Sequence, residues 1–215
     1  MNITSDALSL LNAARTQHGF LASASDISNY KRIWARDGVI CGLAALLSVN
    51  DSLIETFKNT LSTLADHQHR LGNIPSNVHF KEDGTTEVSF GGLAGRVDTI
   101  AWFVIGVCNY SHFVKDKRFL DRMLPHIDRG LDLLQAWEFN NKGLIYVPRS
   151  GNWADEYITE GHIFYDQVLR LWALRCLQRV TYSESRNKYI ERLTTLIENN
   201  YQKGSFKNPY HPKAY

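Results

Sequence analysis

The hydrophobic positions of this chain recur at helical spacing, in two distinct patterns. The first pattern is apolar on nearly all sides and occupies residues 39–49, 100–114 and 163–180. A helix that is apolar all round is normally buried between other elements, so these three segments are predicted to be core helices. The second pattern is amphipathic, with apolar residues at i, i+3, i+4 and i+7, and it predicts surface helices over 52–68, 119–139 and 189–201.

The two kinds of helix alternate strictly along the chain, buried then amphipathic, three times over. The connections within each pair are only two or three residues long, at 50–51, 115–117 and 181–183, and such short connections make antiparallel helical hairpins. The buried segments begin about 60 residues apart, which indicates a repeated structural unit. We therefore predict an all-α chain whose inner layer of three helices is wrapped by an outer layer, with a further helix near 6–18.

Long segments with little helical pattern lead from each outer helix to the next inner one. The stretch 77–90 carries Asp83-Gly84 between two β-prone runs, which predicts a small β-hairpin in this loop. Residues 140–162 also lack a helical pattern. Loops of this length in a compact domain are usually functional, so these segments are the places to look for a site.

The composition is that of a globular chain: 44% of its 215 residues are hydrophobic, and its net charge is +2. A charge so near neutral argues against a nucleic-acid partner, and no stretch reaches the roughly 18 consecutive apolar residues of a membrane span. The three cysteines are far apart in apolar runs, and the N-terminus lacks the pattern of a secretion signal. These features predict a cytoplasmic protein with no membrane partner.

The residues that can carry chemistry gather in three loops, each directly before an inner helix. In chain order they are Trp34, Arg36, Asp37, Arg96, Asp98, Trp153, Asp155 and Glu156. Parallel inner helices would bring the three loops to one end of the structure. The sequence therefore predicts one site that is assembled from three separated segments.

This combination of side chains suits a sugar. Carboxylates and arginines hydrogen-bond to hydroxyl groups, and aromatic faces stack on the apolar face of a pyranose. Glycoside hydrolysis needs two carboxyl groups beside the scissile bond, one to protonate the leaving oxygen and one to activate water or attack the anomeric carbon. A carboxyl group beside tryptophan in a partly desolvated loop would have a raised pKa, as a general acid requires.

The same residues also have structural interpretations. Asp37 and Asp98 stand where a helix begins, and aspartate is a preferred N-cap residue. The neighbouring arginines are then ordinary ion-pair partners. Trp102 and Trp172 lie within inner helices, a position more typical of a core, whereas the tryptophans of the loops lie beside charged residues and favour a site.

Neither a metal ion nor a cofactor is expected. His67 and His69 are spaced i, i+2, so they do not face one partner on a helix. The glycine-rich segment 91–95 lacks the GxxxxGK[ST] pattern of a phosphate-binding loop.

The three loops together resemble the corresponding elements of the (α/α)6-toroid, or six-hairpin, glycosidases. The Trp34-Ala35-Arg36-Asp37 segment resembles the Trp-x-Arg-Asp element of this superfamily, and Gly95-Arg96-Val97-Asp98 followed by Trp102 resembles the start of its next inner helix. The Trp153-Ala154-Asp155 segment is similar to the Trp-Met-Asp of the amylo-α-1,6-glucosidase type found in glycogen debranching enzymes, with alanine in place of methionine. The resemblance covers roughly residues 28–180.

The resemblance implies a glycosidase that hydrolyses an α-glucoside or oligosaccharide by general acid/base catalysis with inversion, without a cofactor. Its substrate-binding residues would be Trp34, Arg36, Asp37, Arg96, Asp98 and Trp153. Asp155 would be the general acid that protonates the glycosidic oxygen, with Glu156 as the nearest alternative.

The length of the chain fits about half of such a ring, since six hairpins at this period would need about 360 residues. In these families the catalytic base comes from a later hairpin, and residues 201–215 contain no carboxylate side chain. We therefore expect residues 1–215 to form a single partial toroid domain that is truncated at its C-terminus and inactive alone. The exposed flanks of its inner helices predict self-association.

Two other functions fit the same residues. The first is a carbohydrate-binding protein that has kept the sugar site and lost the base. The second is a helical-repeat interaction protein, in which the loop tryptophans and aspartates serve packing and capping. Sugar binding distinguishes the second from the others, and release of sugar distinguishes an enzyme from a binding protein.

Overall fold

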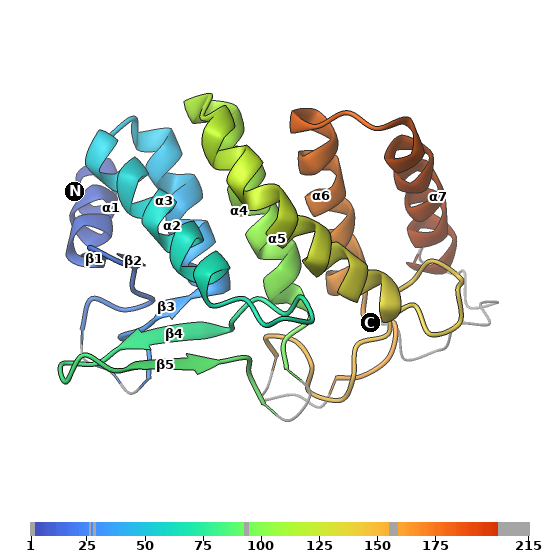
Figure 1. Cartoon of the computed structure of the whole chain (residues 1–215), viewed down its shortest axis with the longest axis horizontal. Coiled ribbons are helices and arrows are strands. Elements are labelled where there is room, and N and C mark those ends of the chain that lie inside the picture. Colours follow the sequence, from blue (N-terminus) through green and yellow to red (C-terminus); the bar gives the residue numbers. More distant parts are fainter. Residues whose placement is uncertain (1–2, 26, 28, 93–94, 155–158, 202–215) are drawn as a thin grey trace.

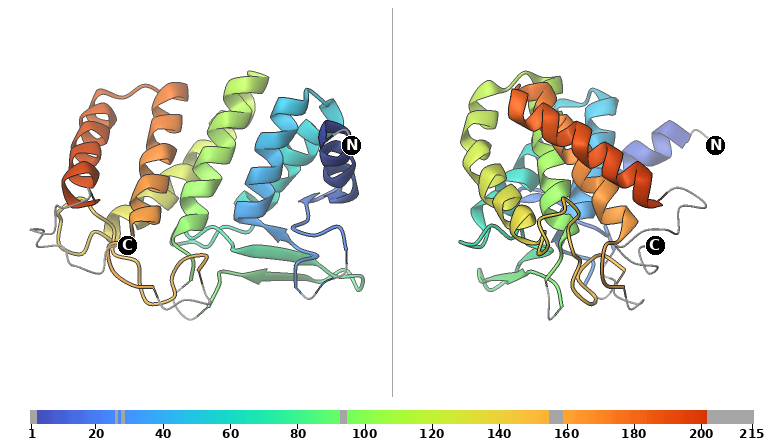
Figure 2. Two further views of the ribbon diagram at one scale, coloured as in Figure 1. Left: turned by 180° about the vertical axis from the view of Figure 1, so that it is seen from behind. Right: turned by 90° about the vertical axis from the view of Figure 1, so that its right-hand side faces the viewer.

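The computed structural model describes residues 3–25, 27, 29–92, 95–154 and 159–201, which fold into helical hairpins beside a small β-sheet (Figure 1). The inner helices are α2 (Ala35–Ser48), α4 (Asp98–Val114) and α6 (Phe164–Val180). Each leads into an outer helix, and these are α3 (Asp51–Asp66), α5 (Lys117–Ala136) and α7 (Glu184–Tyr201). Figure 2 shows the inner helices side by side, with α4 in the middle. The predicted all-α architecture of alternating inner and outer helices is confirmed.

The same two-residue connection joins the helices in each of the first two hairpins. Val49 and Lys115 adopt the left-handed conformation, with φ of 54° and 62°, and they end α2 and α4. The next residue in each case is an N-cap: the side chain of Asn50 accepts a hydrogen bond from the amide of Leu53, and Asp116 caps α5 in the same way. One residue therefore stops a helix and its neighbour starts the next, which makes each connection tight.

A small sheet lies beside α2 and α3, below them in the view of Figure 1. The strands β3 (Ile33–Trp34), β4 (Asn77–Phe80) and β5 (Thr86–Ser89) form an antiparallel sheet, and Asn77 pairs with Ser89. The predicted hairpin over 77–90 is thus confirmed, and β3 adds a strand to it that is too short to give a pattern of its own.

The N-terminal segment differs from its prediction. A helix was expected near 6–18, but α1 (Ile3–Ala13) ends earlier, and the chain turns back through β1 (Arg15–Thr16) and β2 (Gly19–Phe20). Gly19 has a φ of +137°, and a Cβ there would lie 2.5 Å from Oγ1 of Thr60. The close approach to α3 and the unusual dihedral angle together require glycine and end the helical pattern.

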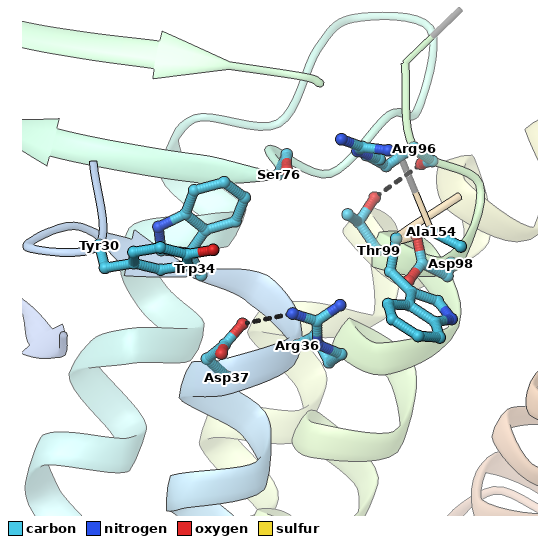
Figure 3. Close-up of a pocket in the computed structure, with 10 residues that line it drawn as sticks. Tyr30, Trp34, Arg36, Asp37, Ser76, Arg96, Asp98, Thr99 and Ala154 are labelled. Carbon is cyan, nitrogen blue, oxygen red and sulfur yellow. Dashed lines mark hydrogen bonds and ion pairs between the residues drawn. The ribbon is translucent and has the colours of Figure 1, made fainter. Parts of the chain in front are cut away.

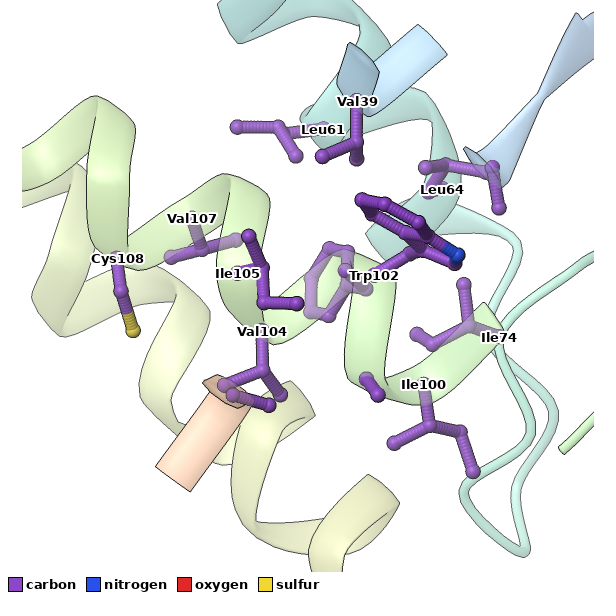
Figure 4. Close-up of a cluster of buried hydrophobic side chains, with 14 of the residues drawn as sticks. Val39, Leu61, Leu64, Ile74, Ile100, Trp102, Val104, Ile105, Val107 and Cys108 are labelled. Atoms are coloured by element: carbon purple, nitrogen blue, oxygen red, sulfur yellow. The ribbon is translucent and has the colours of Figure 1, made fainter. Parts of the chain in front are cut away.

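The core is centred on α4, in which every residue from Asp98 to Ser111 is buried. Its side chains meet Val39 of α2 and Leu61 and Leu64 of α3 in one cluster (Figure 4). Glycine allows close helix contacts in this cluster, since a Cβ at Gly106 would lie 2.7 Å from Leu61 and 2.9 Å from Val39. A second, smaller cluster joins α6 to α7.

Apolar side chains also remain exposed on α2 and α6. Ile40 and Leu47 of α2 are 48% and 83% exposed, and Phe164, Val168 and Trp172 form an exposed stripe on α6. We call these five residues the inner-helix flanks. Trp172 is 41% exposed, so its interpretation as a core residue is wrong. One edge of contact remains, because its ring and that of the buried Trp102 have centroids 5.8 Å apart. Within the described residues, no helix combines the length and the apolar character needed to cross a bilayer.

Replacing Gly42 by alanine should destabilise the fold, because the new Cβ would lie 1.9 Å from the ring of Phe57. Overpacking of this kind costs about 1–3 kcal/mol, measured by urea unfolding followed by circular dichroism. The matched control is Gly92→Ala, whose new Cβ meets no atom of the described residues within 4 Å and which should change the free energy of unfolding by less than about 0.5 kcal/mol. Equal effects of the two substitutions would contradict the packing of α2 on α3.

We propose that copies of the chain associate through the inner-helix flanks, because exposed apolar patches favour burial. Sedimentation velocity should show a sedimentation coefficient that rises with protein concentration. The double substitution Leu47→Lys with Trp172→Lys should abolish that rise. Leu71→Lys is the control, since Leu71 is 60% exposed but lies outside the flanks. A monomer whose sedimentation is independent of concentration would refute the association.

Candidate functional site

The three loops that precede the inner helices meet around one cavity of about 260 Å³ at the N-terminal ends of these helices. Its lining consists of Tyr30, Trp34, Arg36, Asp37, Ser76, Arg96, Asp98, Thr99, Trp153 and Ala154 (Figure 3). All six residues predicted to bind substrate are among them, so the predicted convergence of the loops is present in the structure. Asp155 and Glu156, the predicted catalytic residues, lie outside the described residues and follow Ala154 directly in the sequence.

Aromatic side chains stand on different sides of this cavity, with charged groups between them. Tyr30 and Trp34 pack together, with ring centroids 6.0 Å apart. The guanidinium of Arg36 lies 5.6 Å from the centre of the Trp153 ring and 3.2 Å from a carboxylate oxygen of Asp37. The cavity therefore presents aromatic faces together with hydrogen-bond donors and acceptors.

Asp37 and Asp98 are not helix caps, contrary to the structural interpretation of their positions. The N-cap residues of α2 and α4 are Trp34 and Val97, and neither makes a side-chain capping bond. The two aspartates lie in the first turn of their helices instead. A carboxylate in the first turn is favoured by the helix dipole while remaining able to face a ligand.

Asp98, which lines the cavity, has one buried carboxylate oxygen without a hydrogen-bond partner among the described residues. Its Oδ2 accepts a hydrogen bond from the Tyr165 hydroxyl at 3.4 Å, and that hydroxyl accepts one from the Trp102 indole. Its other oxygen, Oδ1, is buried and has no hydrogen-bond partner among the described residues. Burial raises the pKa of Asp98 to about 6, although the nearby Arg36 and Arg96 guanidinium groups lower it.

Arg96 connects two of the three loops. It is only 8% exposed, and its guanidinium donates to the backbone carbonyl of Asn152 and lies 3.5 Å from that of Ser150. Its aliphatic stem packs on Gly91, where a Cβ would lie 2.6 Å from Cγ of the arginine. The role of Arg96 in the structure is thus to hold the loop before α6 against the start of α4.

Asp166 is a buried acid near the site that the sequence interpretation missed. It is 2% exposed, and its Oδ2 accepts a hydrogen bond from the Asn152 side chain at 3.0 Å. Burial raises its pKa to about 8; the bond from Asn152 lowers the pKa, and the charge of Asp98 raises it. A signal was present, because Asp37, Asp98 and Asp166 each lie in the first turn of an inner helix.

The described residues include no cluster of three or more histidine, cysteine, aspartate or glutamate side chains that could hold a metal ion. His67 bonds through Nδ1 to the carbonyl oxygen of Thr63, and His69 packs edge-on against Phe90. The two histidines therefore have structural contacts of their own.

A larger hollow, of about 420 Å³, lies near His18 and Phe80, and none of the predicted site residues lines it. Its cationic side chains are already engaged, since Arg32 and Lys81 both pair with Glu87. The predicted substrate-binding residues therefore line the smaller cavity and not this one.

Comparison with known proteins places the fold. No protein-family model matches the chain, and no curated protein matches its sequence. A solved structure described as a rhamnosidase from Klebsiella oxytoca with rhamnose bound aligns with 90% of the chain, with a TM-score of 0.68 and 19% sequence identity. A second, described as a wild-type glycosidase, aligns with 91% of it, with a TM-score of 0.58 and 14% identity. The chain spans 36% and 55% of these two proteins, and the similarity shows that it shares the fold of the aligned parts.

The raised pKa values predict that stability falls as the pH rises. Between pH values of about 4 and 8, folded Asp166 still binds a proton that the unfolded chain has released, so the free energy of unfolding declines by up to about 1.4 kcal/mol per pH unit. Asp98 contributes in the same direction, up to a pH of about 6. Asp166→Asn removes the first contribution, so the decline above pH 6 should become shallower in urea unfolding.

The matched control for this pH experiment is Asp132→Asn, at an exposed position of α5. Its stability should follow that of the wild-type protein across the whole pH range. If Asp166→Asn also ran parallel to the wild type, Asp166 would not hold its proton in the folded state.

Proposed function

We propose that this chain is a glycoside hydrolase of the six-hairpin toroid type and that its cavity binds one sugar residue of an α-glucoside or oligosaccharide. The observation that carries the proposal is the unpartnered Oδ1 of Asp98. Asp98 lines a cavity that also holds the Arg36–Asp37 pair and the Trp153 ring. A buried acceptor without a partner costs free energy, and a ligand hydroxyl group would satisfy it.

The charges of the cavity suit a neutral sugar. Arg36 is paired with Asp37, and Arg96 donates to a backbone carbonyl, so both cations already have partners. An anionic ligand would have to compete with these contacts. A neutral pyranose needs donors, acceptors and an aromatic face, and the residues around the cavity offer all three.

For hydrolysis, we propose Asp155 as the general acid, with Glu156 as the alternative. Asp155 is joined to Ala154, which lines the cavity, and it completes the Trp-Ala-Asp segment that resembles the debranching type. Inversion requires a second carboxylate as the base that activates water. In the families that the chain resembles, this base comes from a later hairpin than the three described here.

We also propose that the protein works in the cytoplasm. None of its three cysteines forms a disulfide, and Cys108 and Cys176 are buried. Burial raises the pKa of the Cys176 thiol, which keeps it protonated and unreactive.

A second candidate function is carbohydrate binding without hydrolysis. It is favoured by the cavity itself, because all six proposed binding residues line it, and binding a sugar needs neither a general acid nor a general base. The two functions share the sugar site and differ only in the chemical step.

Titration calorimetry with malto-oligosaccharides tests the sugar site. The wild-type protein should bind, and Arg36→Ala should weaken the affinity by about tenfold or more, because it removes a charged hydrogen-bond donor from the cavity. Arg175→Ala is the matched control, since this arginine is exposed on α6, where its guanidinium donates to the Thr194 hydroxyl, and it does not line the cavity. L-rhamnose and other neutral sugars extend the panel. Absence of binding to all of them by the wild type and the control would leave only a scaffold role.

The chemical step is then assayed as release of free sugar. Hydrolysis by the wild-type protein would appear as free sugar, and Asp155→Asn should abolish that release while retaining affinity. A wild-type protein that binds and releases nothing would support the binding function instead.

A further inference from the structure

We propose that Asp166 is a positioning residue for the sugar site: it holds the side chain of Asn152, which fixes the loop that presents Trp153 to the cavity. The inference rests on the proposed function for the nature of the ligand. The contacts that anchor the loop are a property of the fold and can be tested without any ligand.

Asn152 is the centre of this anchor. Its side chain is almost completely buried, and its amide nitrogen donates to Oδ2 of Asp166 at 3.0 Å. Its amide oxygen accepts hydrogen bonds from the Ala154 backbone at 3.0 Å and from the Thr159 hydroxyl at 3.2 Å. The backbone carbonyl of Asn152 accepts from Arg96. Because both the nitrogen and the oxygen of this buried amide are hydrogen-bonded, the side chain has one favoured position. Residues 151–154 are fixed with it.

The anchor joins this loop to two inner helices. Asp166 belongs to the first turn of α6, and Arg96 directly precedes the start of α4. A further backbone bond runs from the amide of Val97 to the carbonyl of Gly151 at 2.7 Å. Residues 151–154 contain neither helix nor strand, so these contacts take the place of regular secondary structure.

The anchored loop determines where Trp153 stands. This residue follows Asn152 directly, and its ring lies over the guanidinium of Arg36, which belongs to α2. Trp153 is 47% exposed, and besides Arg36 its ring meets that of Tyr165, with centroids 6.1 Å apart. The position of its backbone, and with it the place of the aromatic wall of the cavity, depends on the residue before it and through that residue on Asp166.

The protonation state of Asp166 suits this role. With its pKa raised to about 8 by burial, Asp166 is neutral at physiological pH. It can then accept the bond from Asn152 without placing a second buried charge beside Asp98. Asparagine has the same shape as the protonated acid and keeps an acceptor oxygen, whereas alanine has none. The proposal therefore expects Asp166→Asn to retain the anchor and Asp166→Ala to lose it.

Hydrogen exchange measured by mass spectrometry tests the anchor directly. In Asp166→Ala, the amides of residues 149–154 and of Val97 should exchange about tenfold faster or more, because the loop opens locally. In Asp166→Asn they should exchange within about twofold of the wild type. Asn109→Ala is the matched control, since Asn109 is also buried and hydrogen-bonded, but lies near the far end of α4.

Asn152→Ser provides a second route if Asp166→Ala does not fold. Serine keeps a hydroxyl group for the Ala154 amide but is too short to reach Asp166, so faster exchange in the same segment is again expected. Unchanged exchange in a folded Asp166→Ala or Asn152→Ser protein would overturn the proposal. Equally fast exchange in Asp166→Asn and Asp166→Ala would also overturn the proposal. A side chain with the shape and acceptor oxygen of the protonated acid would then fail to hold Asn152.

Affinity for maltotriose links the anchor to the site. Asp166→Ala should weaken binding by about tenfold or more, while Asp166→Asn and Asn109→Ala bind as the wild type does. Equal affinity of Asp166→Ala and wild type would refute the positioning role. If the exchange results are as expected but the wild type binds no sugar, the proposed function fails and the anchoring of the loop by Asp166 stands.

Discussion

The structure depends on the packing of α4 between α2 and α6. Because α4 is buried from Asp98 to Ser111, both neighbouring helices are held against a continuous apolar surface, and all three begin at the same end of the molecule. This alignment determines where the outer helices and the connecting loops lie. The outer helices cover the remaining side of the inner layer, and the loops between hairpins have to return to the end where the next inner helix begins.

This alignment also accounts for the electrostatics of the site. Three helix N-termini converge, and each inner helix carries an aspartate in its first turn, where the helix dipole favours negative charge. For Asp98 and Asp166, however, burial outweighs that benefit and raises both pKa values. The same geometry that gathers the side chains into one cavity therefore also keeps two of the three acids from ionising readily.

The helices and the meeting of the loops could be predicted from the sequence, because the spacing of apolar residues and the short connections determine them. The finer features depend on tertiary contacts that leave no periodic signal. Asp166 was missed because it lies inside an apolar helix rather than in a loop, and only its equivalence to Asp37 and Asp98 would have marked it. Trp172 was placed in the core because its helix is apolar all round, whereas the structure leaves one side of α6 uncovered.

The anchoring of one loop by Asp166 has a consequence for the order in which the chain folds during synthesis. The described residues that line the cavity all precede Asp166 in the sequence, yet the loop that completes the lining is held in part by that later residue. The first two hairpins can pack as soon as they leave the ribosome, since α2, α3 and α4 share one core. The cavity closes only after the first turn of α6 has emerged, so its assembly is a late step of folding.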